Sequence, residues 1–390
     1  MWYSAFLIKR TLEHVAMSPL IAMGYLYGCC TPFAKAYQKV LFFPFYHTGG
    51  AEAVHARVAK VWGGPDTLII FTRKSTDNRY FTAFVQTNST VLDYSKYTGT
   101  KWLYPVNIFF RGVLAARLAK AKPVLVFNGQ CNFAYKLSPW LPKAIPQVEL
   151  IHSFNSFSWI RLPYLAYYRK SICIAQVALQ KHVQQYKNLG VPEELASKWT
   201  FISNGVPVPQ EPTVKSAPNP LTVLWVGRNS EEKRLGVFEQ LATQALHLPI
   251  QFICIGTEKP NTNNIQYIPT ITQESALAKW YAKAHMLCIT SSTEGFPMVV
   301  MEAAAHGCLI LSTPVGDIPH RLQNEPFAYI TQTIEPTSVI EEMVAQLQQW
   351  TTTSHLAPLH AQAYSFASNH FSLATFERNY TQLASEYKKN

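Results

Sequence analysis

The chain has 390 residues, 48% of them hydrophobic, and 34 basic against 23 acidic side chains, which leaves a formal net charge of +11. This length suffices for two α/β domains, and the hydrophobic content excludes an intrinsically disordered chain. The positive charge favours anionic partners such as nucleotides, phospholipid headgroups or nucleic acid, without selecting among them. The seven cysteines have no CxxC spacing and mostly fall in apolar runs, which predicts buried free thiols in a reducing cytoplasm.

Residues 1–38 form an N-terminal extension of mainly helical character. Residues 15–34 carry no charged side chain, so a membrane-spanning helix is one interpretation. Helix-breaking residues interrupt the run, namely Pro19, Gly24, Gly28 and Pro32. They favour instead a helix that packs on the body of the protein or lies at a membrane surface, and a cleaved signal peptide is the third interpretation.

From residue 39 to residue 205, apolar strand-like runs alternate with helical patterns, which is typical of parallel βαβ units in a Rossmann-like domain. The predicted strands are residues 39–45, 66–72, 123–127, 148–152, 171–175 and 199–203. The predicted helices include residues 52–62, 111–122 and 180–189. A proline-rich segment, residues 206–220, then predicts an interdomain linker.

The alternation resumes in residues 221–365 and predicts a second domain of the same kind. Its predicted strands are residues 221–226, 250–255, 286–290 and 308–313. Its predicted helices are residues 235–247, 274–285, 298–306 and 336–350. In the C-terminal segment, residues 366–390, an amphipathic stretch at 371–389 predicts a closing helix that packs back across the first domain.

Two glutamates, Glu294 and Glu302, flank the predicted start of a helix that follows a buried strand. Pro297 suits the first position of that helix because it lacks an N–H and its φ is already helical. The N–H groups of Met298 and Val299 then face the crevice, where a helix N-terminus attracts phosphate. Carboxylates on either side of a bound diphosphate can accept hydrogen bonds from hydroxyl groups.

Gly227, Arg228 and Lys233 follow the first strand of the second domain. The two cations therefore lie at the carboxyl edge of the same sheet as Glu294, and a guanidinium with an ammonium suits a diphosphate. A solvated surface loop is the alternative.

In the first domain, Gly49 and Gly50 precede a helix whose start also suits phosphate, although a tight turn explains them equally. His152 ends a strand and would point into the crevice, or be a structural histidine. Residues 159–170, aromatic and basic, could lie on a membrane, line an acceptor site or pack as a surface helix.

Several motifs are absent from the sequence. There is no Asp-x-Asp pair, HExxH or Cys/His ligand spacing, so no metal site is predicted. The GxGxxG and GxxxxGK[ST] motifs are also missing, which argues against a dehydrogenase and a P-loop NTPase.

From about residue 39 to the C-terminus, the chain resembles the retaining nucleotide-sugar glycosyltransferases of family 4. The likeness is strongest in four motifs that occur in the family's order: residues 201–206, 226–233, 294–302 and 314–319. The resemblance implies the GT-B fold, with two facing Rossmann-like domains, a deep cleft and a C-terminal helix crossing back to the first domain. One departure lies at Val315-Gly316-Asp317, where a Gly-Gly pair is commoner in the family.

The resemblance also implies roles for the residues above. Arg228 and Lys233, in the loop begun by Gly227, would bind the donor diphosphate with the backbone of Met298 and Val299. Glu294 would hold hydroxyls of the transferred sugar, and Glu302 would bind the ribose. The remaining positions would surround the donor: the backbone of Gly295, Phe296 and Pro297 at the sugar, Gly256 and residues 267–269 near the base, His152 at the sugar, and Gly49 and Gly50 beside the diphosphate and acceptor.

The activity implied is transfer of a hexosyl-type group from a nucleotide-diphosphate sugar to an acceptor hydroxyl with retention of configuration, with the phosphate as base and no metal or cofactor. The acceptor would be a saccharide or a lipid-linked molecule in surface polysaccharide or glycolipid biosynthesis. The protein would be cytoplasmic, with peripheral contact with the anionic inner face of the plasma membrane as an open interpretation, and nucleic acid is not an expected partner. A nucleotide-sugar epimerase or phosphorylase of related fold, or a catalytically silent scaffold, are the alternatives.

Overall fold

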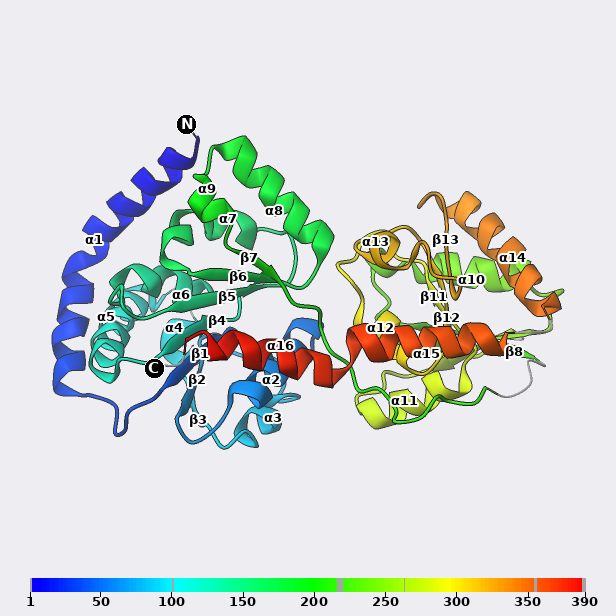
Figure 1. Cartoon of the computed structure of the whole chain (residues 1–390), viewed down its shortest axis with the longest axis horizontal. Helices are drawn as coiled ribbons and strands as arrows, with labels where there is room; N and C mark the ends of the chain where they lie inside the picture. The colour runs from blue at the N-terminus through cyan, green and yellow to red at the C-terminus, as the bar shows by residue number, and fades with distance from the viewer. Residues whose placement is uncertain (1, 100–101, 216–219, 263, 354–355, 388–390) are drawn as a thin grey trace. The chain divides into compact units, whose positions relative to one another are not determined.

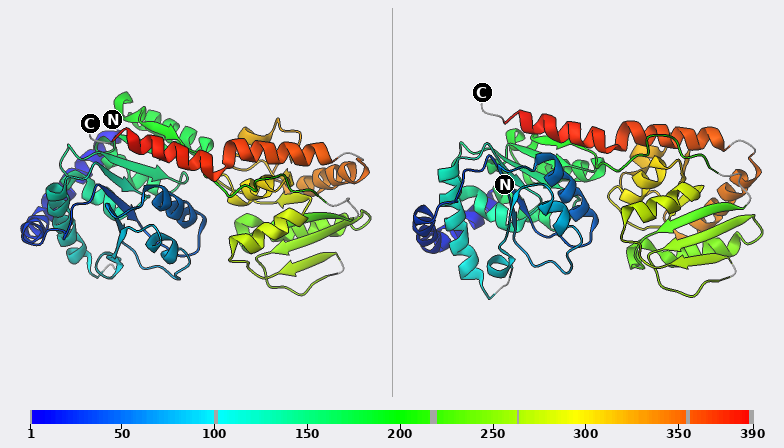
Figure 2. Two further views of the ribbon diagram at one scale, coloured as in Figure 1. Left: turned by 60° about the horizontal axis from the view of Figure 1, so that its bottom comes forward. Right: turned by 90° about the horizontal axis from the view of Figure 1, so that it is seen from below.

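The computed structural model describes residues 2–99, 102–215, 220–262, 264–353 and 356–387. The chain forms two compact units, each a parallel sheet covered by helices (Figures 1 and 2). The first unit contains Met1–Ile202 and Glu377–Asn390, and the second contains Ser203–Phe376. Parts of three predicted segments lie outside the described residues: residue 1 of the extension, residues 216–219 of the linker and residues 388–389 of the closing helix.

The sheet of the first unit has seven parallel strands in the described part of the chain, in the order β3-β2-β1-β4-β5-β6-β7. The strands are β1 Lys39–Phe43, β2 Thr67–Phe71, β3 Thr90–Asp93, β4 Leu125–Asn128, β5 Gln147–Ile151, β6 Lys170–Cys173 and β7 Trp199–Phe201. The strand order reverses beside β1, as in Rossmann-like domains. The central strands are mainly apolar because both faces of a parallel sheet are buried, although β5 also contains the buried charged residue Glu149.

Helices cover both faces of this sheet. They are α1 Trp2–Cys30, α2 Gly50–Trp62, α3 Phe81–Val85, α4 Ser95–Thr98, α5 Tyr104–Ala121, α6 Asn132–Leu137, α7 Phe157–Ile160, α8 Gln176–Leu189 and α9 Glu193–Ala196, with the 3₁₀ turns η1 Ser138–Trp140 and η2 Leu162–Tyr167. Successive side chains of β1 point to opposite faces. Phe42 packs in one core cluster with Leu114 of α5, whereas Phe43 contacts His55 of α2.

Helix α1 packs along α5 through close backbone contacts, and the two run side by side in Figure 1. A Cβ on Gly24 would lie 2.0 Å from the carbonyl oxygen of Phe109, and a Cβ on Gly112 would lie 2.0 Å from that of Ile21. Only glycine allows such an approach. These contacts therefore fix which face of α1 is covered and which remains exposed.

Pro19 lies inside α1 and has no N–H to donate to the carbonyl oxygen of Val15. The hydroxyl of Ser18 donates to that oxygen instead, at 2.8 Å, and the helix continues to Cys30. Across the described residues, no helix combines the length and apolar character that a membrane crossing requires.

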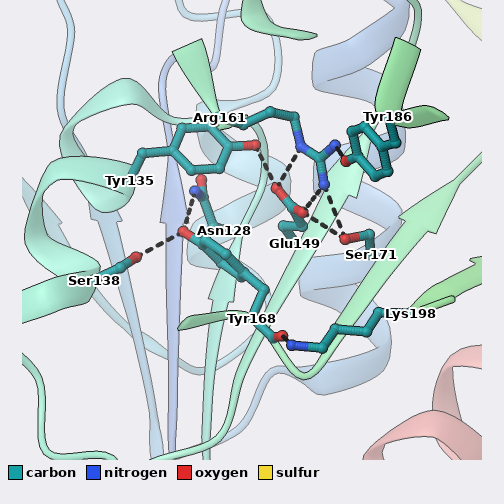
Figure 3. A network of polar contacts seen from close by, with 9 residues as sticks. All are labelled: Asn128, Tyr135, Ser138, Glu149, Arg161, Tyr168, Ser171, Tyr186 and Lys198. Atoms are coloured by element: carbon teal, nitrogen blue, oxygen red, sulfur yellow. Dashed lines mark hydrogen bonds and ion pairs between the residues drawn. The ribbon is translucent and has the colours of Figure 1, made fainter. Parts of the chain in front are cut away.

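A buried polar network includes Glu149 of β5 and Ser171 of β6 (Figure 3). The carboxylate of Glu149 forms an ion pair with the guanidinium of Arg161, and both side chains are almost fully buried. Tyr135 donates to Glu149 Oε2 at 2.7 Å, Ser171 donates to Oε1 at 2.5 Å, and the Arg161 guanidinium lies 4.8 Å from the Trp199 ring centre. Residues 159–170 are thus anchored in the core by Arg161, and Trp159 remains exposed.

The second unit has a six-stranded parallel sheet within the described residues, in the order β10-β9-β8-β11-β12-β13. The strands are β8 Leu221–Val226, β9 Ile250–Ile255, β10 Ile265–Ile268, β11 Met286–Ile289, β12 Leu309–Ser312 and β13 Ala328–Ile330. The helices are η3 Glu231–Lys233, α10 Leu235–Gln244, α11 Glu274–Lys283, α12 Met298–Ala305, α13 Ile318–Leu322, α14 Pro336–Thr352 and α15 Ala357–Phe371.

All ten predicted strands are present, and three further strands were not predicted: β3, β10 and β13. Each is an edge strand of its sheet with at most four residues. Edge strands are covered less than central ones, so these segments lack the continuous apolar run by which the central strands are recognised.

The predicted closing helix, residues 371–389, is wrong at its start. The structure has α15, which ends at Phe371, and α16 Leu373–Ser385, with Ser372 between them. The backbone of Val206 separates them, because its N–H donates to Phe371 O at 2.7 Å and its carbonyl accepts from Leu373 N at 3.1 Å. The return of α16 to the first unit is confirmed: Trp62 Nε1 donates to Tyr380 O at 2.9 Å.

Acid should destabilise the first unit through His182. Burial, and then the charge of Arg161, lowers the pKa of His182 from 6.5 to about 3. Between these values the unfolded state binds the proton and the folded state does not, so the free energy of unfolding falls by about 1.4 kcal/mol per pH unit as pH decreases. His182→Phe keeps the ring beside Trp199 and should make the slope shallower by that amount in urea titrations at several pH values. Equal slopes for the two proteins would contradict this assignment.

Candidate active site

The loops after β8 and β11 meet at one edge of the second sheet. These two strands are neighbours, although β9 and β10 separate them in sequence, so the strand order reverses beside them. Ligands in open α/β sheets bind outside the carboxyl ends of the strands at such a position. The first loop carries Arg228 and Lys233, and the second carries Glu294.

Lys233 and Glu294 contact each other directly in this edge. Lys233 Nζ lies 2.5 Å from Glu294 Oε1, and Ser291 Oγ donates to the same oxygen at 2.7 Å. The side chains are 23% and 12% exposed, so the pair is partly shielded from water. Arg228 is exposed in the same loop. The glutamate therefore orients the ammonium group, a contact that the sequence did not predict.

Arg234 joins the two loops and was not predicted as a functional residue. Its guanidinium donates from Nε to Thr290 O at 2.6 Å, and its backbone has φ +51°. Thr290 Oγ1 donates in return to Lys233 O at 2.9 Å. A positive φ at an arginine has no sequence signature, because such backbone is typical of glycine and asparagine. Because Lys233 directly precedes Arg234 in the chain, these hydrogen bonds fix the backbone from which the Lys233 side chain extends.

Helix α12 begins at Met298, as in the predicted range 298–306, so Pro297 precedes the helix and does not occupy its first position. Pro297 is its N-cap, with extended backbone, and Met298 is the first helical residue. The first-turn N–H groups lack acceptors within the helix, so this end retains its affinity for anions. The Phe296 side chain is buried against Phe371 and Arg321, with the Arg321 guanidinium 4.3 Å from its ring centre. Phe296 can therefore offer only its backbone to a ligand.

The backbone at Gly295 is held by the loop after β12. Asp317 N donates to Gly295 O at 2.7 Å, and Gly316 has φ +56°. A Cβ on residue 316 would lie 1.9 Å from that same oxygen, so only glycine fits there. Gly316 thus meets the steric requirement of the loop, although Val315 stands where the related family commonly has another glycine.

Glu302 lies on the second turn of α12 and is half-buried. Its Oε2 accepts a hydrogen bond from the hydroxyl of Tyr281 at 3.0 Å. Burial, and then the Glu302 carboxylate, raises the pKa of Tyr281 well above its usual range. Tyr281 therefore stays a donor at neutral pH and holds the Glu302 side chain in place.

Gly227 and Gly256 bring the loops after β8 and β9 into contact. Gly256 has φ +107°, and a Cβ there would lie 2.2 Å from Gly227 O. Tyr267, in the segment predicted near the base, is buried, and its hydroxyl donates to Glu239 Oε1 at 2.6 Å. Gly227, Gly256 and Tyr267 therefore shape the same sheet edge mainly through their backbone atoms.

In the first unit, His152 pairs with His55, a residue that the sequence analysis missed. Their Nε2 atoms lie 2.8 Å apart, so one ring donates and the other accepts. Burial lowers the pKa of His152 to about 4, and burial, then His152, lowers the pKa of His55 well below its usual value. Both rings are uncharged at neutral pH. The spacing of buried residues at positions 52, 55, 59 and 62 of α2 could have indicated His55.

Gly49 is the N-cap of α2 and Gly50 is its first residue. The side chain of Glu52 folds back over this helix start: a Cβ on Gly49 would lie 2.1 Å from Glu52 Oε2. Burial raises the pKa of Glu52, and His47 Nε2 lies 3.6 Å from its Oε1. A carboxylate therefore already occupies the helix end that was predicted to suit phosphate.

Where the chain is described, no three His, Cys, Asp or Glu side chains come together as a metal site would require. Five of the cysteines are buried free thiols, and Cys29 and Cys30 are exposed at the end of α1.

Residues 220–350, which include both loops of the sheet edge, match the family described as glycosyl transferases group 1. No curated protein sequence matches the chain.

Three solved structures illustrate the similarity of fold. Anabaena HepE in complex with UDP and glucose has a TM-score of 0.67 at 15% identity, over 90% of this chain and 99% of that one. A glycosyltransferase from Rickettsia africae has a TM-score of 0.67 at 13% identity, over 91% and 99% of the two chains. The lipopolysaccharide outer core galactosyltransferase WaaB has a TM-score of 0.63 at 15% identity, over 89% and 99%. The predicted GT-B fold is thereby confirmed.

Proposed function

We propose that the chain transfers a glycosyl group from a nucleotide-diphosphate sugar to an acceptor hydroxyl. One observation carries the proposal: within the segment that matches glycosyl transferases group 1, the Lys233 and Glu294 side chains meet at the switch point of the second sheet, beside the start of α12. A cation and a helix N-terminus suit a diphosphate, and a carboxylate suits sugar hydroxyls.

In this proposal Arg228 and Lys233 bind the diphosphate and stabilise its charge as it leaves, together with the backbone of Met298 and Val299. Glu294 accepts hydrogen bonds from the sugar hydroxyls. Because Glu294 also contacts Lys233, it couples the position of the sugar to that of the leaving group.

The nucleoside would lie over the neighbouring strands, with its ribose on Glu302 and its base near Gly227, Gly256 and residues 267–269. In the first unit, His152 would meet a sugar as a neutral hydrogen-bonding group, and Gly49 and Gly50 would border the acceptor, because Glu52 covers the helix start that was predicted to suit phosphate. Burial keeps His152 uncharged at neutral pH, so it can donate or accept without adding charge.

Glu302→Gln should raise the Kd of the nucleotide-sugar by about tenfold, the cost of one hydrogen bond to a charged group, with a much smaller change in kcat. Glutamine retains an acceptor for the Tyr281 hydroxyl, so the fold should be preserved. Calorimetric titration and steady-state kinetics would separate the two effects. A large loss of kcat with unchanged Kd would contradict the ribose assignment.

The proposal includes retention of anomeric configuration, the leaving phosphate as the base, and no need for a metal. Calorimetric titration with a panel of UDP- and GDP-sugars in EDTA tests binding first, and NMR of the product then reports its anomeric configuration. UDP-sugars head the panel because the similar Anabaena protein was solved with UDP and glucose. If the chain binds no nucleotide-sugar, it would be a catalytically silent scaffold. If it converts one nucleotide-sugar into another without any acceptor, it would be an epimerase.

We further propose a saccharide or lipid-linked acceptor, in surface polysaccharide or glycolipid biosynthesis at the cytoplasmic face of a membrane. The net charge of +11 supports an anionic surface as a partner.

A further inference from the structure

Helix α1 carries a second apolar face that the first unit leaves exposed. One side of the helix is covered by α5, through Ile21, Gly24 and Gly28. The other side carries large apolar side chains that are 59–69% exposed: Ile8, Leu12, Val15, Met23 and Leu26. Their spacings of four, three, eight and three residues place them on one face of an α-helix. We call this set the α1 stripe.

The α1 stripe has the features of a helix that lies in a membrane interface. Lys9 is the exposed charged residue beside it, and residues 15–34 contain none. Aromatic side chains stand near its two ends, with Trp2 71% and Tyr27 53% exposed, and such residues prefer the level of lipid headgroups. A helix of 29 residues is about 43 Å long, so it offers a long line of contact when it lies flat.

A cavity of about 290 Å³ lies at the N-terminal half of α1, and Lys9 connects it to the stripe. Its charged lining residues are three cations, Lys9, Arg10 and Lys136, against one carboxylate, Glu13. Two buried lining atoms have no hydrogen-bond partner: Nε of Arg10 and Oδ1 of Asn132. The excess of positive charge and the unpaired donor suit an anionic headgroup.

We propose that α1 docks on an anionic phospholipid bilayer, with the α1 stripe at the boundary of headgroups and acyl chains and a lipid phosphate in the cavity of Lys9, Arg10 and Lys136. A second copy of the chain fits the stripe less well. Paired helices usually choose register and partner through charged residues beside the apolar seam, and residues 15–34 provide none. The proposal concerns the first unit and does not depend on the proposed reaction.

Co-sedimentation of the full chain with vesicles tests the proposal without any sugar donor. Vesicles of phosphatidylcholine with phosphatidylglycerol should bind the protein, and pure phosphatidylcholine vesicles should bind it much more weakly. Lys9→Gln with Lys136→Gln should weaken binding by about 25-fold, near fivefold for each cation. Leu12→Gln and Leu26→Gln should each weaken it about tenfold or more, because each removes an apolar side chain from the contact.

Leu246→Gln is the matched control, since Leu246 is a 61% exposed leucine of the second unit, and its binding should equal that of the unchanged protein. Circular dichroism of every variant checks that the helices are retained. Equal binding to neutral and anionic vesicles, or unchanged binding by the lysine variants, would overturn the headgroup site. Stripe variants that convert a dimer to a monomer in analytical ultracentrifugation, without change in vesicle binding, would assign the stripe to a second copy instead.

Discussion

Lys233→Met should lower kcat for glycosyl transfer by about 100-fold or more, the usual cost of removing one preorganised group that stabilises developing charge. The substitution removes the ammonium group that lies 2.5 Å from Glu294 Oε1 and keeps a side chain of similar length. Because the proposed interaction with the diphosphate strengthens as the nucleotide leaves, kcat should fall more than donor affinity. Steady-state rates and donor titration of the same preparation measure both.

Lys170→Met is the matched control for this experiment. Lys170 also forms a lysine–glutamate pair, 2.6 Å from Glu386, but it starts β6 of the first unit, at the end of that strand opposite its carboxyl end, and lies outside the predicted donor site. The kcat of Lys170→Met should stay within about twofold of that of the unchanged protein, since a pair whose side chains are 31% and 42% exposed contributes little. If Lys233→Met retained full turnover with a normal melting temperature, the proposed diphosphate role of Lys233 would be rejected.

Arg161→Met should lower the free energy of unfolding of the first unit by about 3–5 kcal/mol, because it leaves the buried Glu149 carboxylate without its cation. That loss is a large part of the total stability of a typical domain. Among the described residues, the hydrogen bonds left to the Glu149 carboxylate would then be those from the Tyr135 and Ser171 hydroxyls (Figure 3). Urea unfolding followed by tryptophan fluorescence would report the change, since Trp199 lies beside the guanidinium.

The double variant Arg161→Met with Glu149→Gln distinguishes the effect of the unpaired Glu149 charge from that of the lost Arg161 packing. The amide keeps an acceptor for Tyr135 and Ser171 and carries no charge, so the double variant should regain much of the stability lost in the single one. If the two variants are equally destabilised, the cost comes from lost packing of the Arg161 side chain and the ion-pair explanation fails.

Much of the fold could be predicted from the sequence because central parallel strands and their helices have strong local patterns. The runs at residues 221–226 and 250–255 match β8 and β9 to the residue, since a strand buried on both faces is mainly apolar. Edge strands such as β10 and the break at Ser372 were missed. Their positions depend on neighbours that are distant in the chain, as the contact of Val206 with Phe371 illustrates.

The candidate site could likewise be predicted only in part. Residue type and order along the chain were enough to select Arg228, Lys233, Glu294 and Glu302, because charged groups after buried strands of an α/β sheet lie at its carboxyl edge. The residues that support these side chains could not be predicted from the sequence. Arg234 contributes through a left-handed backbone, and His55 through its contact with His152.

By itself, the sequence determined that the chain is a two-domain α/β protein with cations and carboxylates after its strands, because hydrophobic periodicity and residue type are local properties. Only the tertiary structure decided that Lys233 pairs with Glu294, that Tyr281 holds Glu302 and that one face of α1 is covered while the other is exposed. Those outcomes depend on strand order and on close packing at Gly24 and Gly112, which join residues far apart in the chain and leave no local pattern in it.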